Sequence, residues 1–241
     1  MRNKAIRFIK VPTSFTSSRS TDLIFYILTL PQNALKKGQG IFMEWELLNV
    51  VGTIAFAASG AIIAMDEKYD IFGVWLLAFT TAFGGGAIRN VLLGNPVSLI
   101  WQQNDLFILC FLVALLIFLL PNVVLPHWER WGVIVDAIGL VAFAFQGAQV
   151  AIKLDLPLSA AIAAAVLTGV GGGVVRDLLA GRKPLVLQSE VYAIWAIIIA
   201  VVTYYFRLEG GLPVYTLLVV VAALRVISYY RKWNLPARKV R

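Results

Sequence analysis

The sequence has almost none of the residues that build disulfides, metal centres and hydrolytic sites. Its 241 residues include one cysteine, Cys110, and one histidine, His127. These counts leave no intramolecular disulfide and no cysteine-based metal cage, and they argue against a histidine-rich metal site. His127 falls in the predicted loop between two apolar segments, so no Cys–His or Ser–His–Asp set is available. We therefore expect no catalytic residue, no metal, no cofactor and no enzyme activity.

Charge is also scarce. Only 14% of the residues are charged and 60% are hydrophobic, whereas an average soluble domain has about 25% charged and 45–50% apolar residues. This balance excludes a water-soluble globule and, more firmly, a disordered chain. The formal net charge is +8, but the basic residues flank apolar segments and form no aromatic-laced patch, so we expect no nucleic-acid partner. An integral membrane protein remains.

Seven long apolar segments support this class. A bilayer core of about 30 Å needs roughly 20 apolar residues per helix, and the breaks between the segments hold charges or turn-forming residues. The sequence therefore predicts an all-α membrane protein with seven transmembrane helices. These spans cover 45–65, 71–93, 106–120, 131–152, 158–180, 191–206 and 213–230, with 121–130 as one of the breaks.

The two ends of the chain are basic. Seven basic residues and one acidic residue precede Met43, and this composition predicts a poorly structured tail over 1–42, with Met43 as an alternative start. If that tail is discounted, the positive-inside rule places the C-terminus in the cytoplasm. The C-terminal basic residues are expected to contact anionic lipid headgroups; they include Arg231, Lys232, Arg238 and Lys239.

An internal repeat organises the spans. The segment 56–61 returns at 143–148, and the segment 81–90 returns at 168–177, both with an offset of 87 residues. One register across two helices and their loop is a specific signal. It predicts a three-helix repeat over 43–130, a second over 131–208, and a seventh helix with a basic tail over 209–241. Because three crossings reverse the direction of entry, the two repeats are expected to be inverted, as in many transporters.

A glycine triplet lies at the matched position of each repeat, at 84–86 and 171–173. Glycine costs about 1 kcal/mol relative to alanine inside a helix, so a compensating use is expected. We predict that Gly84, Gly85, Gly86, Gly171, Gly172 and Gly173 break or bend their helices toward a water-filled path. Close helix–helix packing is the alternative.

Polar residues gather around these triplets. Ionisable residues within the membrane are costly and mark pathways by default. For the arginines the alternative is snorkelling to the headgroups, and for the threonines it is a hydrogen bond to their own backbone. We expect the following residues to line or gate a pore: Asn49, Ser59, Thr81, Arg89, Asn90, Asp136, Gln146, Thr168, Arg176 and Asp177.

The doubled motif resembles a known family. Phe-Ala-x-Ser-Gly-Ala, followed downstream by Gly-Gly-Gly-x-x-Arg and then Asp or Asn, is similar to prokaryotic members of the trimeric intracellular cation (TRIC) channel family, also described as a bacterial glycine transporter domain. The resemblance implies a homotrimer in a bacterial or archaeal plasma membrane. It also implies one pore per protomer, helices bent at both triplets, and passage of monovalent cations, K⁺ in preference to Na⁺. Asn49 and Asn90 stand where the second repeat has Asp136 and Asp177, so the first repeat lacks both carboxylates.

Three functions stay open at this level. A passive cation channel needs a hydrated path lined by weakly binding polar groups. A secondary transporter of glycine or a similar zwitterion would instead hold the carboxylate at a helix N-terminus and the ammonium at an aspartate. A non-conducting scaffold is the least favoured, because it would not need two matched glycine motifs.

Overall fold

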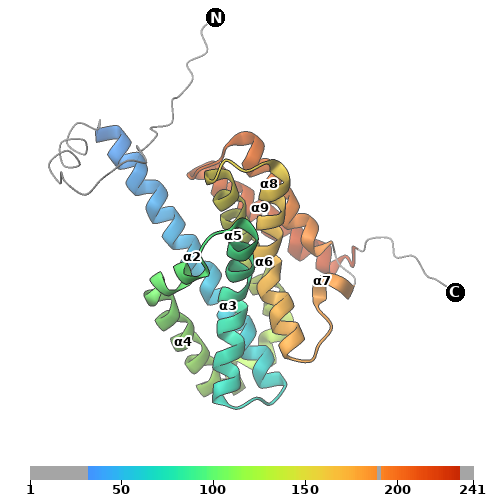
Figure 1. The fold of residues 1–241 in the computed structure, drawn as a ribbon. Coiled ribbons are helices and arrows are strands. Elements are labelled where there is room, and N and C mark those ends of the chain that lie inside the picture. The colour runs from blue at the N-terminus through green and yellow to red at the C-terminus, as the bar shows by residue number, and fades with distance from the viewer. Residues whose placement is uncertain (1–31, 189–190, 234–241) are drawn as a thin grey trace, which may run out of the picture. The chain divides into compact units, whose positions relative to one another are not determined.

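The computed structural model describes residues 32–188 and 191–233 (Figure 1), with side chains from Trp45 onward except at 123, 127, 129, 130 and 188. The chain divides into compact units over Met1–Gln39 and Gly40–Arg241, and the packed helices belong to the second unit. The long elements are α2 (Gln32–Asp66), α3 (Ile71–Leu93), α4 (Asn104–Leu119), α5 (Pro121–Lys153), α6 (Leu158–Leu179), α8 (Tyr192–Phe206) and α9 (Leu212–Tyr230). Two short elements are the 3₁₀ helix η1 (Val97–Gln102) and α7 (Leu185–Gln188).

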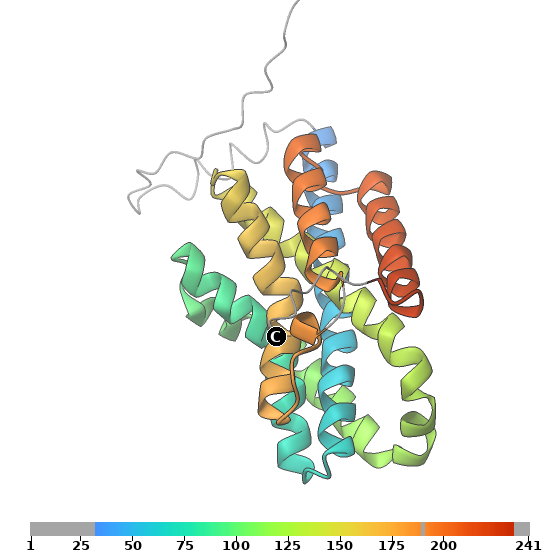
Figure 2. The same ribbon diagram turned by 90° about the vertical axis from the view of Figure 1, so that its right-hand side faces the viewer.

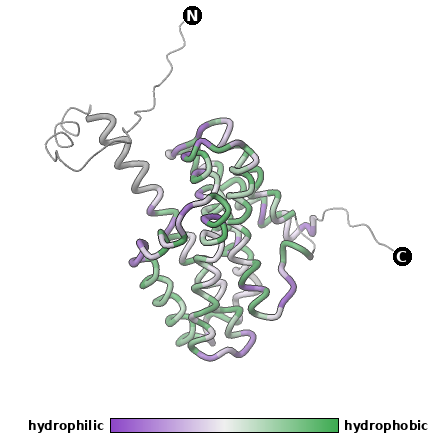
Figure 3. Tube along the Cα trace, in the orientation of Figure 1, coloured by the Kyte–Doolittle hydropathy of each residue, from purple (hydrophilic) through white to green (hydrophobic). Residues whose placement is uncertain are grey.

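Each predicted span has a helix at its position. Five helical segments are apolar and long enough to cross a membrane: Trp45–Asp66, Ile71–Leu93, Trp131–Lys153, Leu158–Leu179 and Leu212–Tyr230. The other two helices, α4 and α8, have 16 and 15 residues, which at about 1.5 Å per residue fall short of a 30 Å core. The protein is therefore an all-helical membrane protein, with hydrophobic colour along its helices and hydrophilic colour at the turns (Figure 3).

Two expected boundaries are wrong. The break predicted over 121–130 is helical, because α5 begins at Pro121 and continues through Pro126. Proline at the first helical position loses no hydrogen bond, and Pro126 removes one bond near the start of the helix. His127 is consequently a helical residue. At the other end, α2 begins at Gln32, inside the expected tail; the rest of that tail, 1–31, lies outside the described residues.

The helices of the second unit form a bundle in which α6 packs closely against both α3 and α5 (Figures 1 and 2). One hydrophobic cluster joins α2, α3 and α4 and includes Phe56, Leu77 and the buried Cys110. A second cluster joins α5, α6, α8 and α9 and includes Leu140 and Trp195. Each cluster thus draws mainly on the helices of one predicted repeat.

The helix ends repeat with the same offset as the sequence. Helices α3 and α6 are each followed by a glycine in the left-handed region, Gly94 at φ 71° and Gly181 at φ 70°. The next residue then donates back into the helix, from Asn95 N to the Asn90 carbonyl at 2.9 Å and from Arg182 N to the Asp177 carbonyl at 2.8 Å. This is the closing geometry that glycine permits without steric cost.

Candidate functional site

The middle glycine of each triplet lies at the crossing of α3 and α6. A Cβ atom on Gly85 would collide with the Thr168 carbonyl oxygen, and one on Gly172 would collide with the Thr81 carbonyl oxygen. Both helices run unbroken through their triplets, so the expected interruption is wrong. At Gly85 and Gly172 the close-packing alternative accounts for the glycine. A bend without interruption stays a prediction.

The outer glycines are different. A Cβ atom on Gly84 would lie 3.7 Å from the Val175 side chain, which is an ordinary contact. On Gly86 and Gly173 it would lie 3.8 Å and 3.7 Å from Nη2 of the arginine three residues later. The packing of this chain therefore does not require glycine at these positions. In both repeats the guanidinium lies over the third glycine of its triplet.

Further contacts around the crossing are reciprocal. A Cβ atom on Gly52 would come 2.7 Å from the Phe143 ring, and one on Gly139, 87 residues later, would collide with the Phe56 ring. The two rings meet each other edge to face, with centroids 5.1 Å apart. The approach of Gly52 to Phe143 is thus matched by the approach of Gly139 to Phe56, with both residues of the pair shifted by 87 positions between the repeats.

The threonines that precede the triplets use their hydroxyls within their own helices. Thr81 Oγ1 donates to the Leu77 carbonyl, and Thr168 Oγ1 donates to the Ala164 carbonyl at 2.6 Å. Both side chains are buried. This is the backbone-bonding role weighed for them from the sequence, and it leaves their oxygen lone pairs available as acceptors.

A polar cavity of about 540 Å³, here called the larger cavity, opens beside the second triplet. Its lining brings together four of the predicted residues, Ser59, Asp136, Arg176 and Asp177. Arg176 is 2% exposed, so it does not snorkel to the headgroups. Asp136 and Asp177 are buried beside it.

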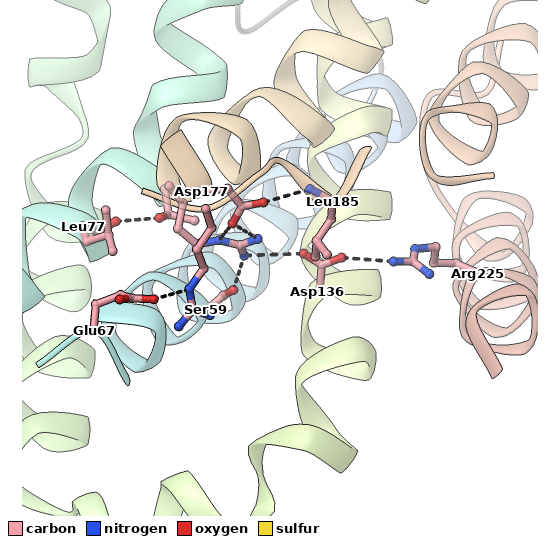
Figure 4. A network of polar contacts seen from close by, with 10 residues as sticks. Ser59, Glu67, Leu77, Asp136, Asp177, Leu185 and Arg225 are labelled. Carbon is pink, nitrogen blue, oxygen red and sulfur yellow. Dashed lines mark hydrogen bonds and ion pairs between the residues drawn. The ribbon is translucent and has the colours of Figure 1, made fainter. Parts of the chain in front are cut away.

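Arg176 is the centre of a buried ion network, and its partners Ser59, Asp136 and Asp177 are labelled in Figure 4. Its Nε donates to Asp177 Oδ1 at 2.8 Å, and its Nη1 donates to Ser59 Oγ. The same Nη1 lies 3.8 Å from Asp136 Oδ1. Asp177 Oδ2 in turn accepts from the backbone N–H of Leu185 at 3.1 Å. Asp177 is thus both ion-paired and hydrogen-bonded, whereas neither carboxylate oxygen of Asp136 has a hydrogen-bond partner among the described residues.

Arg225 on α9 is a network residue that sequence reasoning missed. It is 1% exposed, and its Nη2 lies 3.7 Å from Asp136 Oδ2. Its guanidinium also lies 4.6 Å from the centroid of the Tyr192 ring, a cation–π arrangement. The signal was present, since an arginine inside an apolar span is unusual. It was overlooked because Arg225 lies outside the repeat.

A second polar cavity, here called the smaller cavity, has a volume of about 70 Å³. Its lining brings together five other predicted residues, Asn49, Arg89, Asn90, Gln146 and Thr168. Four of them are the 87-residue counterparts of the larger cavity's residues: Asn49 of Asp136, Arg89 of Arg176, Asn90 of Asp177 and Gln146 of Ser59. Thr81 is the one predicted polar residue outside both linings.

The two cavities differ in charge. Arg89 donates from Nε and Nη2 to Asn90 Oδ1 at 3.0 Å and 2.8 Å, which repeats the geometry of Arg176 on Asp177. The acceptor is an amide oxygen, however, and the described lining of the smaller cavity holds no carboxylate. The larger cavity has two aspartates against four basic residues, Arg176, Arg182, Lys183 and Arg225.

An ion-pair cluster at the ends of α2 and α6 includes Arg182, which also lines the larger cavity. Arg182 pairs with Asp66 through Nη2 and with Glu67 through Nε. Burial alone would lower the pKa of Arg182, but the hydrogen bonds and charges of the two carboxylates raise it above its ordinary value. Tyr69 also donates to the Leu179 carbonyl at 2.9 Å. The turn after α2 and the turn after α6 therefore lie at the same end of the bundle. No cluster of three metal-binding side chains occurs among the side chains that the structure describes.

Both repeats of this chain are similar to a known protein family. The profile of the family described as "Glycine transporter" matches residues 46–122 and 133–208, so its two matches begin 87 residues apart. A solved structure described as "Structural basis for conductance through TRIC cation channels" is 34% identical, has a TM-score of 0.71 and covers 81% of this chain and 98% of that one. The chain belongs to the prokaryotic TRIC family.

Other members of the TRIC family extend this result. A crystal structure of a prokaryotic TRIC channel in 0.5 M KCl is 31% identical, with a TM-score of 0.74 over 80% of this chain and all of that one. The membrane protein YvgT of Bacillus subtilis is 54% identical over 199 residues, which are 83% of this TRIC family member and 98% of YvgT. The similarity therefore spans both cavities and the crossing of α3 and α6.

Proposed function

We propose that this TRIC family member is a channel for monovalent cations, K⁺ in preference to Na⁺, with one pore in each protomer of a homotrimer. The observation that carries the proposal is the pair of polar cavities built from equivalent residues of the two repeats. Each contains an arginine that lies over the third glycine of a triplet. The crossing of α3 and α6 between the triplets would be the constriction that joins them.

Two inverted three-helix repeats over 43–130 and 131–208 are part of this proposal, with 209–241 as the seventh helix and C-terminal tail. The support is the reciprocity of the contacts, since Gly85 meets Thr168 and Gly172 meets Thr81. An axis that exchanges two helices in this way is a twofold axis. The short helices α4 and α8 would be the third span of each repeat.

The polar groups fit weak ion binding. The larger cavity offers the Ser59 hydroxyl and the Asp136 and Asp177 carboxylates, and the smaller cavity offers amide oxygens and the Thr168 hydroxyl. Oxygen ligands of this kind can replace part of a hydration shell without holding the ion tightly. At the crossing itself the helix backbones are in contact. Conduction would therefore require the outer glycines to bend, or α3 and α6 to separate.

The proposal also covers the contacts of the protein with lipid and with a second protomer. Exposed apolar side chains such as Leu112, Leu116 and Leu119 on α4 suit lipid or a second protomer. Arg231 and Lys232 follow α9 and would contact anionic headgroups at a cytoplasmic C-terminus. The chain would lie in a bacterial or archaeal plasma membrane.

The deciding experiment is a planar-bilayer recording of the purified full chain in symmetric KCl without amino acids. The proposal expects unitary currents, and a K⁺:Na⁺ gradient should give a reversal potential that favours K⁺. A quiet bilayer at protein densities that give current with a known TRIC channel would contradict it.

A second candidate is a secondary transporter of glycine or a similar zwitterion. The observation that favours it is Arg89, whose charge faces no carboxylate in the described lining of the smaller cavity and could hold a substrate carboxylate. Uptake assays in proteoliposomes distinguish the two. Saturable, gradient-dependent glycine uptake without unitary current supports the transporter, and current without such uptake supports the channel.

A further inference from the structure

The smaller cavity has the donors of an anion site but lacks the anion that its counterpart contains. In the larger cavity, Arg176 reaches the Asp177 carboxylate through Nε and Nη2 and lies near the Asp136 carboxylate through Nη1. Both equivalents in the smaller cavity, Asn90 and Asn49, are neutral amides. One cavity therefore carries its own counter-charges, and the other does not.

Two further observations show that donors in the smaller cavity are unused. Gln146 is 3% exposed, and its Nε2 has no hydrogen-bond partner among the described residues. A buried amide N–H₂ without a partner carries the full desolvation cost of its donors. In addition, no ion pair joins Arg89 to a carboxylate among the described side chains, whereas Arg176, Arg182 and Arg225 all have one. A cationic group that faces no carboxylate and a primary amide whose N–H₂ has no partner thus share one small cavity.

We infer that the smaller cavity binds one small monovalent anion, chloride or the carboxylate of a small molecule, on Arg89 and Gln146. The anion takes the electrostatic place that Asp136 and Asp177 fill in the other half. The cavity volume of about 70 Å³ admits a halide or a carboxylate group and excludes larger polyanions. A bound anion offsets the charge of Arg89 and lowers the barrier to a cation beside it. The site does not depend on the proposed channel function, because binding is measured on the protein at rest.

Asn90→Asp is the sharpest test, because it supplies the missing carboxylate in a geometry that the chain already uses for Arg176 and Asp177. The purified full chain is placed in gluconate buffer and titrated with chloride, with the ³⁵Cl linewidth and the thermal unfolding midpoint followed together. The wild type should show saturable broadening and a midpoint that rises with chloride. Asn90→Asp should weaken chloride binding by about tenfold or more, as expected when a charge-assisted hydrogen bond is lost.

Asn122→Asp is the matched control, since it makes the same chemical change at an exposed residue of α5 outside both cavity linings. It should leave the chloride response unchanged. If Asn90→Asp does not fold, Asn49→Asp provides the same test from α2. Competition by glycine but not by glycinamide would assign the carboxylate as the physiological anion, and no competition would assign the halide. The inference is overturned if the wild type shows no saturable chloride response, or if a folded Asn90→Asp or Asn49→Asp retains it in full.

Discussion

Two buried arginines share the carboxylate of Asp136. Arg176 approaches one oxygen at 3.8 Å, and Arg225 approaches the other at 3.7 Å. Both distances are longer than a direct hydrogen bond, so the coupling is mainly electrostatic. Because Arg176 comes from α6 and Arg225 from α9, this carboxylate also connects the repeat to the seventh helix.

Replacement of the Asp136 carboxylate by an amide is expected to destabilise the fold. Asp136→Asn removes the charge between the two guanidinium groups while keeping the side-chain volume, and breaking a buried ion pair costs about 3–5 kcal/mol. Thermal unfolding of the detergent-solubilised protein should therefore begin at a clearly lower temperature. Asp66→Asn is the control, since that carboxylate is 64% exposed and an exposed pair contributes at most about 1 kcal/mol. Equal effects of the two substitutions would contradict the assigned role of Asp136.

At the scale of elements, the glycine triplets separate into two kinds of position. The middle glycines set the distance between α3 and α6, because any side chain there meets a carbonyl of the other helix. Of the outer glycines, Gly84, Gly86 and Gly173 face a side chain at ordinary contact distance, whereas a Cβ atom on Gly171 would lie 3.3 Å from the Gly85 backbone. The middle glycines are therefore required for close packing of α3 and α6, and the outer glycines are predicted to permit bending. The two roles can be tested separately.

Gly85→Ala and Gly172→Ala should force the helices apart and reduce stability by about 1–3 kcal/mol, the usual cost of overpacking. Gly86→Ala and Gly173→Ala should leave the unfolding temperature nearly unchanged and instead reduce ion flux, since alanine stiffens the helix beneath the guanidinium. Unfolding and flux measured on the same preparations separate the two effects. Unchanged flux in a folded Gly86→Ala, Gly173→Ala double variant would rule out bending at the outer glycines.

The elements also show what sequence can and cannot predict here. Hydropathy located all seven helices, because burial in lipid demands long apolar runs whatever the partner helix. The offset of 87 residues relates Arg89 to Arg176 and Asn90 to Asp177, and the first of each pair lines the smaller cavity while the second lines the larger one. It did not distinguish Gly85 from Gly86, because that difference is a backbone distance across two helices. The break predicted over 121–130 was wrong because a proline near the start of a helix removes only one hydrogen bond, so α5 can continue through Pro126.

At the scale of the whole molecule, the ion pairs fall into a partly exposed group and a buried group. The pairs of Arg182 with Asp66 and Glu67 lie at one end of the bundle and are partly exposed, where water screens them. The pairs around Arg176 are buried and act at full strength on anything that enters the larger cavity. Under the proposed channel function, the distribution of charge between the two cavities, more than the net charge of +8, would decide which ions enter.

Inverted repeats predict that equivalent turns of the two repeats lie on opposite sides of the membrane, which a labelling experiment can test. Lys68 and Asp155 occupy equivalent turns, since both follow the first helix of a repeat and both have a left-handed backbone, at φ 60° and φ 54°. Both side chains are exposed. Parallel repeats would place these turns on the same side of the membrane, and inverted repeats place them on opposite sides.

The test uses single cysteines at the two turns. Cys110 is buried, and Cys110→Ala gives a background without thiols, to which Lys68→Cys or Asp155→Cys is added. With a cytoplasmic C-terminus, a membrane-impermeant maleimide should label Asp155→Cys in intact cells and Lys68→Cys only after the membrane is opened. Because both turns have the same backbone geometry, any strain from the new residue is matched between the two variants. Labelling of both cysteines from one side would show that the repeats are not inverted, and the proposed pairing of the cavities across the membrane would fail with them.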